Sequence, residues 1–74
     1  MLPAEDAEKL LVILRVIRDQ RSLSEVERAK ATTALAELEG ARRVRRGRAL
    51  RVQVTVLMDA LEVIAAYFYD RYGQ

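Results

Sequence analysis

Apolar residues recur at three- and four-residue spacing through the first part of the chain. This spacing places side chains on one face of an α-helix. Over residues 3–20 the repeat consists of Ala7, Leu10, Ile13, Leu14 and Ile17. Pro3 suits the first turn of a helix, where a missing N–H group costs nothing, and the acids that follow would lie at the positive end of the helix dipole. We therefore expect a first helix over about residues 3–20.

A second amphipathic repeat follows over residues 23–39. Its apolar positions are Leu23, Val26, Ala31, Ala34, Leu35 and Leu38. The preceding Ser22-Leu23-Ser24-Glu25 matches a capping box, in which a serine hydroxyl and a glutamate three residues later satisfy each other's backbone amides. Gly40 suits the position just after a helix, because glycine enters the left-handed conformation without steric cost. We expect a second helix over about residues 23–39.

The third segment carries two overlapping patterns. An apolar seam with alternating four- and three-residue steps, typical of a coiled coil, consists of Leu50, Val54, Leu57, Leu61, Ile64 and Phe68. Residues 50–56 also alternate between apolar and polar positions, which is typical of a β-strand. A helix over about 48–72 and a β-hairpin over 42–56 are thus both compatible with the sequence. The helical pattern covers more residues and favours the helix.

Together these elements predict an all-α fold: a helical hairpin plus a long C-terminal helix in a single domain, residues 1–74, with a basic connector at 41–47. A chain of 74 residues buries only about 60% of its unfolded surface. Hydrophobic residues make up 51% of the chain, more than a small monomer can hide. We therefore expect an oligomeric bundle, a homodimer first, with the seam of Leu50, Val54, Leu57, Leu61, Ile64 and Phe68 as its interface.

Charge changes this picture, because positive charge gathers in one stretch. The formal net charge is +2 and residues 41–51 alone carry +6, so the rest of the chain sums to −4. The arginines of this stretch are Arg42, Arg43, Arg45, Arg46, Arg48 and Arg51. Guanidinium groups stay ionised and present a planar fork of donors that suits phosphate oxygens. The cluster predicts a phosphate-binding site and a nucleic acid as partner.

Two other interpretations of the arginines are compatible with the sequence. They could form a solvated surface, or they could pair with acids of another protein chain at the rim of a bundle. Acids that could receive them in a second copy are Glu37, Glu39, Asp59 and Glu62. The function hypotheses are therefore a small dimeric nucleic-acid-binding protein and a helical interaction protein that binds itself or another protein.

The composition excludes several kinds of chemistry. The chain has no cysteine and no histidine, which removes disulfides, Cys/His zinc sites and Ser-His-Asp triads. We expect no enzyme activity, no cofactor and no metal. No apolar run reaches the length of about 18 residues that spans a bilayer, and acids stand where a signal peptide is basic. We expect a cytoplasmic protein without a membrane span.

Aromatic residues cluster near the C-terminus. They are Tyr67, Phe68, Tyr69 and Tyr72. Tyrosine combines a large apolar body with a polar tip, so such a group suits a protein interface or a stacking platform for bases. The group lies some twenty residues from the arginines in the sequence, which favours the interface.

The middle of the chain resembles the winged helix-turn-helix family of DNA-binding domains over about residues 8–56. The resemblance lies in the Leu35-x-x-Leu38 ending of a helix, the glycine after it and the arginine-rich run that leads into residues 50–55. It implies a recognition helix that faces the major groove with Thr32, Thr33 and Glu37, and a β-wing at 42–56 with Arg45, Arg46 and Arg48 near phosphates. The chain departs from the family between residues 27 and 34, where no glycine provides the turn between the second and third helices.

Overall fold

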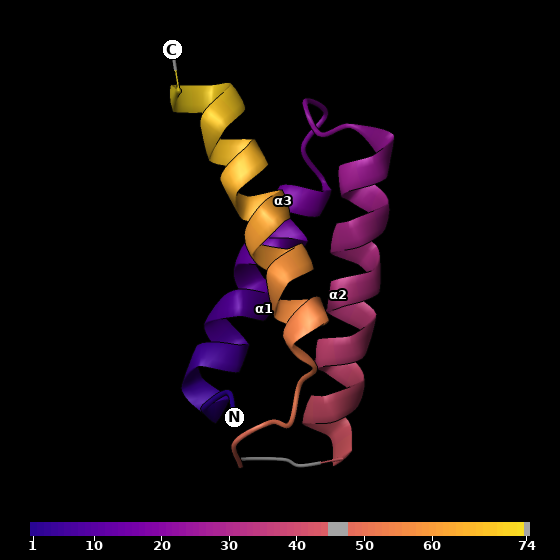
Figure 1. Cartoon of the computed structure of the whole chain (residues 1–74), viewed down its shortest axis with the longest axis vertical. Helices are drawn as coiled ribbons and strands as arrows, with labels where there is room; N and C mark the ends of the chain where they lie inside the picture. The colour runs from indigo at the N-terminus through magenta and orange to yellow at the C-terminus, as the bar shows by residue number, and fades with distance from the viewer. Residues whose placement is uncertain (45–47, 74) are drawn as a thin grey trace.

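The computed structural model describes residues 1–44 and 48–73, and it is all-α. Three helices follow one another: α1 (Ala4–Arg18), α2 (Glu25–Val44) and α3 (Val54–Tyr72). They run up, down and up, and α3 lies across both helices of the α1–α2 hairpin (Figure 1). The molecule measures 38 × 19 × 19 Å. The predicted hairpin plus long C-terminal helix is confirmed.

Leucine and alanine side chains fill the space between the helices. One buried cluster consists of Leu11, Leu14, Ala34, Leu35, Leu38 and Ala60. A second one consists of Ile17, Leu23, Ala31 and Val63. Alanines at these contacts allow the helix axes to approach closely, because the distance between packed helices depends on the side chains between them. In these clusters α1 contributes large residues, whereas α2 and α3 contribute alanines as well.

The loop between α1 and α2 places the N-cap two residues later than the sequence predicts. The Ser24 hydroxyl accepts a hydrogen bond from the backbone N–H of Glu27 at 3.2 Å, and α2 begins at Glu25. Leu23 is buried in the second cluster but precedes the helix, so Ser22 and Leu23 belong to the loop. The Arg28 guanidinium fixes this loop by donating to the carbonyl of Gln20 at 2.8 Å. Ser24, and not Ser22, is the cap.

The prediction that the second helix ends near residue 39 is wrong, because α2 continues through Gly40 to Val44. The additional turn docks on α1: the Arg42 guanidinium donates to the Glu8 carboxylate at 2.7 and 2.9 Å. Arg42 and Arg43 also lie at the negative end of the helix dipole, where cations are stabilised. These contacts stabilise the last turn, so the helix continues past Gly40 although glycine often ends a helix.

Helix α3 begins at Val54 and not near residue 48, because the preceding residues are extended. The backbone of Leu50 pairs with that of Leu2 through two N–H···O bonds of 2.7 and 2.9 Å. Leu50 is 1% exposed and Val52 packs on the first cluster, whereas Arg51 points to solvent. Residues 50–53 thus alternate between inward and solvent-facing side chains as a strand does, and the helix begins at Val54.

The β-hairpin considered for residues 42–56 is not formed by the part of the chain that the structure describes. Residues 42–44 are the last turn of α2, and residues 54–56 are the first turn of α3. Between them, residues 48–53 cross the end of the bundle and cover its core (Figure 1). The extended segment therefore covers one end of the core and does not form a β-hairpin.

Candidate interaction surfaces

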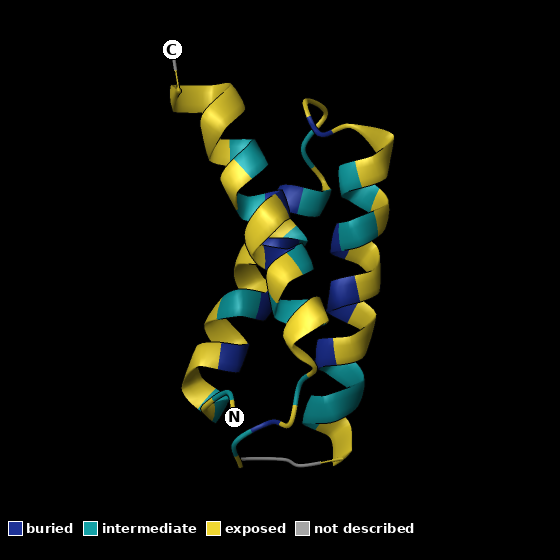
Figure 2. Cartoon of the chain, in the orientation of Figure 1, coloured by how far each residue is buried: buried dark blue, intermediate teal, exposed yellow. Residues whose placement is uncertain are grey.

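The outer side of α3 carries an unbroken row of apolar residues. This row, the α3 stripe, consists of Val54, Met58, Leu61, Ala65, Phe68 and Tyr72, and all six are exposed. Their steps alternate between four and three residues, which keeps them on one face over the whole length of the helix. Leu61, at the centre of the row, is 63% exposed. Figure 2 shows α3 in front of the hairpin with this exposed side outward.

The stripe is exposed because α3 is apolar on nearly all sides. Ala60 and Val63 are buried, and Val56, Ile64 and Tyr67 pack on the two clusters. Apart from Ile64, which lies on the flank, these inner residues lie about half a turn away from the stripe, since each residue advances roughly 100° around a helix with 3.6 residues per turn. Soluble monomers seldom expose so continuous an apolar surface, and such surfaces mark interaction sites.

The observed stripe differs from the predicted seam by a rotation of the helix. Val54, Leu61 and Phe68 belong to both. Leu57 and Ile64 are only partly exposed, on the flank that leads to the core. Leu50 lies in the core, before the helix begins, and is not available to a partner. An interface on α3 would therefore use residues that the predicted seam omits, Met58, Ala65 and Tyr72.

Three apolar residues of α1 are exposed as well. Val12 and Val16 are each 55% exposed, and Ile13 is 41% exposed. They cover little more than one helical turn, whereas the α3 stripe covers nineteen residues of helix. The α3 stripe is thus the more extensive of the two surfaces.

The aromatic group occupies the C-terminal end of α3. The rings of Tyr67 and Phe68 meet edge to face with centroids 5.4 Å apart, and those of Phe68 and Tyr72 stack at 5.8 Å. The Arg71 guanidinium lies 5.9 Å from the centre of the Tyr67 ring and donates to its hydroxyl at 3.1 Å. Phe68 and Tyr72 are members of the α3 stripe, so the aromatic group extends that surface to the end of the helix.

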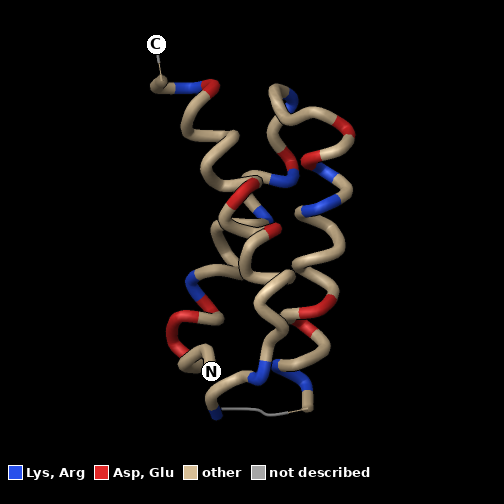
Figure 3. Tube along the Cα trace, in the orientation of Figure 1, with Lys and Arg blue, Asp and Glu red and all other residues tan. Residues whose placement is uncertain are grey.

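The described residues of the arginine-rich stretch lie at the opposite end of the molecule, where α2 ends and the extended segment crosses the core (Figure 3). Arg42 and Arg43 are in the last turn of α2, while Arg48 and Arg51 are in the extended segment. Arg45 and Arg46 lie outside the described residues. The aromatic group and the described arginines are therefore separated by the part of α3 between Val54 and Tyr67, which is about 20 Å long at 1.5 Å per residue. A single short ligand does not reach both.

The described arginines differ in what they contact. Arg42 is partly buried and holds Glu8 of its own chain. Arg43, Arg48 and Arg51 are exposed, and no ion pair within residues 1–44 and 48–73 involves them. These three guanidinium groups are the part of the predicted phosphate site that the structure places in solvent.

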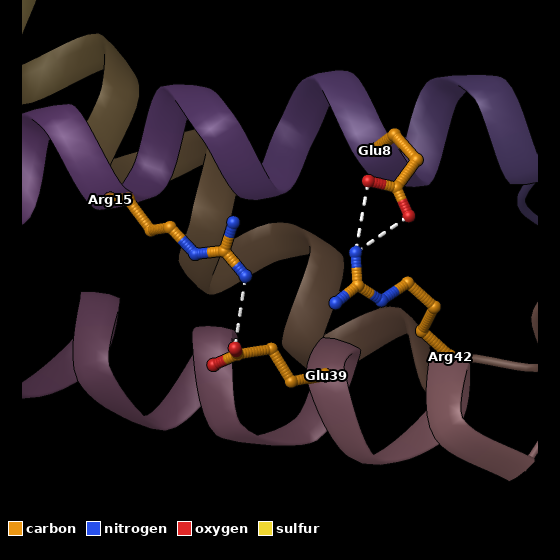
Figure 4. A network of polar contacts seen from close by, with 4 residues as sticks. All are labelled: Glu8, Arg15, Glu39 and Arg42. Carbon is orange, nitrogen blue, oxygen red and sulfur yellow. Dashed lines mark hydrogen bonds and ion pairs between the residues drawn. The ribbon is translucent and has the colours of Figure 1, made fainter.

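Several acids are already paired within the chain. Arg15 of α1 donates to Glu39 of α2 at 2.9 Å, and this pair lies next to the Arg42–Glu8 pair between the same two helices (Figure 4). Lys30 of α2 donates to both carboxylate oxygens of Glu62 at 2.9 Å, and this contact raises the pKa of the Lys30 ammonium. Glu39 and Glu62, expected to receive arginines of a partner chain, thus stabilise helix packing inside one chain.

A groove of about 490 Å³ opens between the C-terminal half of α2 and the start of α3. Its lining residues are Ala36, Glu37, Gly40, Ala41, Val44, Arg51, Val52, Gln53 and Val56. A Cβ atom added at Gly40 would meet no other atom within 4 Å, so the glycine leaves the groove open. Glu37 and Arg51 are the charged residues of its walls.

The residues that the winged-helix resemblance assigns to a recognition helix lie in the middle of α2. Thr32, Thr33 and Glu37 are exposed on a helix that is continuous from Glu25 to Val44. The Thr32 hydroxyl donates to the carbonyl of Arg28 at 2.9 Å. No turn separates residues 27–34 from the helix around them.

The described residues also bear on metal binding and on membrane crossing. Within them, no group of three or more carboxylate, imidazole or thiol side chains could hold a metal ion. None of their helices combines the length and the apolar character that a bilayer crossing requires. Comparison of the chain with models of protein families, with curated proteins and with solved structures finds no match.

Proposed function

We propose that this protein is a helical interaction module that associates with a second copy of itself through the α3 stripe. The observation that carries the proposal is the exposed apolar row along the whole of α3, from Val54 to Tyr72. Transferring apolar surface out of water stabilises association by roughly 25 cal/mol per Å² before the cost of ordering is subtracted. A contact along the stripe would therefore cover the surface that is least suited to water.

The total surface area supports the same proposal. The chain exposes 5352 Å², whereas a compact monomer of 8.4 kDa would expose roughly 4,600 Å² by the usual scaling with mass. The excess is roughly 700 Å², close to the 800 Å² or so that each partner buries in a specific interface. The elongated shape of the monomer thus leaves about as much surplus surface as one dimer contact removes.

The substitution Leu61→Lys tests the proposal, because it places a charge at the centre of the stripe. We expect sedimentation equilibrium to give twice the 8.4 kDa chain mass for the native protein and 8.4 kDa for the variant. Helix content measured by circular dichroism should stay unchanged, since Leu61 is 63% exposed and takes no part in the two buried clusters.

Val26→Lys is the matched control. Val26 is also an exposed apolar residue on a helix, 67% exposed, but it lies on α2 away from the stripe. This variant should associate like the native chain. The proposal fails if the native protein stays at 8.4 kDa up to about 1 mM, which limits the association free energy to less than about 4 kcal/mol.

The arginine-rich end supports a second candidate function, binding to the phosphates of a nucleic acid. The observation that favours it is the exposure of Arg43, Arg48 and Arg51 at one end of the molecule without a described acidic partner. Each phosphate contact releases counterions, so the logarithm of the binding constant falls with the logarithm of salt concentration by about 0.9 per contact. Contacts from three arginines would give a slope of about −2.7.

Fluorescence anisotropy with a short labelled duplex over a salt series measures this slope. We expect Arg43→Ala to reduce its magnitude by about 0.9. Arg21→Ala should leave the slope unchanged, because Arg21 is an exposed residue of the loop between α1 and α2, and this loop lies at the other end of the molecule (Figure 1). Absence of binding at low salt, or equal losses in the two variants, would rule out a phosphate site at this end.

A further inference from the structure

The α3 stripe also indicates in which direction two copies would meet. We infer that α3 pairs antiparallel with α3 of a second copy, around a two-fold axis near residue 63, the midpoint between Val54 and Tyr72; this inference rests on the self-association proposed above. A two-fold interface must be complementary to itself, because both partners present the same patch. The order of large and small residues along the stripe decides which orientation meets this condition.

Side-chain size favours the antiparallel orientation. Reversing one helix around residue 63 sets Leu61 against the partner's Ala65. It likewise sets Met58 against the partner's Phe68, and Val54 against the partner's Tyr72. In each of these layers a larger residue meets a smaller one, so the total volume varies less along the interface than it does when each residue meets its own copy, and close packing favours such even filling.

The parallel orientation would pair each residue with itself. Ala65 would then face the partner's Ala65 and leave a gap in the middle of the contact. At the C-terminal end Phe68 and Tyr72 would each meet their own copy, where their rings already stack at 5.8 Å within one chain. Unfilled and crowded layers both destabilise an interface, so this arrangement is the poorer one.

Charge favours the same orientation. Arg48 and Arg51 precede the first turn of α3, and Arg43 lies in the last turn of α2 at the same end of the molecule. A parallel pair would place the two sets of exposed guanidinium groups at one end, where like charges repel. An antiparallel pair places them at opposite ends and also sets the positive end of each helix dipole beside the negative end of the other.

One contact of the antiparallel pair involves like charges. Glu62 lies beside the stripe close to the two-fold axis, so it would approach the partner's Glu62. Each of these carboxylates is held by Lys30 of its own chain at 2.9 Å, and the exposed pair is neutral. The intramolecular ion pair therefore removes the repulsion that this orientation would otherwise create.

Distances between spin labels test the orientation directly. The chain has no cysteine, so Thr55→Cys and Asp70→Cys each create one labelling site on exposed α3 residues outside the stripe. In an antiparallel pair two labels at 55 lie about 24 Å apart along the axis, two at 70 about 21 Å, and one at 55 lies about 2 Å from one at 70. A parallel pair gives about 0 Å for like sites and about 22 Å for the mixed pair.

Pulsed dipolar spectroscopy on each variant and on their mixture, with the mass measured on the same samples, separates the outcomes. A doubled mass with the shorter distance in the mixture supports the inference. A doubled mass with shorter distances between like sites overturns the orientation and leaves self-association standing. If the mass is doubled but every measured distance is longer than the antiparallel pair predicts, α3 is not the interface. A mass of 8.4 kDa rejects self-association itself.

A pair of charge substitutions gives an independent readout by mass alone. In the antiparallel pair the double variant Leu61→Lys with Ala65→Glu sets each lysine against a glutamate of the partner, so it should regain association that Leu61→Lys alone has lost. In a parallel pair like charges would face each other in both layers, and the double variant would stay monomeric. Failure to regain the dimer mass therefore contradicts the inference.

Discussion

Gly40 provides a sharp test of how α2 ends, because its two interpretations predict stability changes of opposite sign. In the structure Gly40 is an interior residue of α2, and an added Cβ would meet nothing within 4 Å. Replacing an interior helical glycine by alanine stabilises a protein by about 0.5–1 kcal/mol, since alanine loses less backbone entropy. If Gly40 instead ended the helix in a left-handed conformation, alanine would cost roughly 1–2 kcal/mol.

Thermal unfolding followed by circular dichroism measures the difference. A change of 1 kcal/mol moves the melting temperature of a domain of this size by roughly 4–8 °C, so we expect Gly40→Ala to raise it by roughly 2–8 °C. The melts are recorded in the Leu61→Lys background, so that self-association does not contribute. A lower melting temperature for Gly40→Ala would refute the assignment of this residue to the helix interior.

Ala36→Gly is the matched control for this experiment. Ala36 is exposed on the same face of α2, one turn before Gly40. The reverse substitution should lower the stability by about 1 kcal/mol. The double variant should return close to the starting melting temperature, because both changes act through the backbone and remove no core contact.

Three further predictions concern the core, the helix cap and one ion pair. Leu50→Ala should destabilise the protein by about 2–5 kcal/mol in urea unfolding, because a buried leucine leaves a cavity; a loss below 1 kcal/mol would contradict its place in the core. Ser24→Ala should cost about 1 kcal/mol and Ser22→Ala close to nothing, since Ser24 caps α2; equal losses would argue against this cap. The pKa of Lys30 is raised by Glu62, so the pair stabilises the fold below the ordinary lysine pKa of 10.5 and loses this contribution as pH rises through the folded-state value. Urea unfolding should therefore show a steeper loss of stability at alkaline pH in the native chain than in Lys30→Met, and parallel curves would contradict the argument.

The kind and number of the helices could be predicted from the sequence, because helical periodicity is a local property. Leu14 and Ile17 of α1 and Leu35 and Leu38 of α2 repeat at the spacing of one helix face, and all four are buried as that spacing predicts. The arginine-rich stretch was placed correctly between the second and third helices, but not its individual residues: Arg43, expected in the connector, lies in α2, and Arg48 and Arg51, expected in a helix, precede α3.

The ends of the helices depended on tertiary contacts. Gly40 is a frequent helix terminator, but the next turn is anchored by Arg42 on Glu8 of α1, a residue 34 positions away. Leu50 fits the first turn of a helix, yet its backbone pairs with Leu2 and its side chain closes the core. Contacts between residues distant in sequence outweigh local preferences of a few tenths of a kcal/mol to about 1 kcal/mol.

Which side of α3 faces solvent was also determined by the tertiary structure. The predicted seam through Leu57 and Ile64 and the observed stripe through Met58 and Ala65 have the same four- and three-residue steps, so periodicity cannot distinguish them. Packing selects between them, because Ala60 and Val63 fit against the α1–α2 hairpin and turn the stripe outward. The sequence by itself determined that α3 is apolar on nearly all sides, because that follows from the order of its residues. Which of these sides packs on its own chain depends on the shape of the α1–α2 surface that receives it.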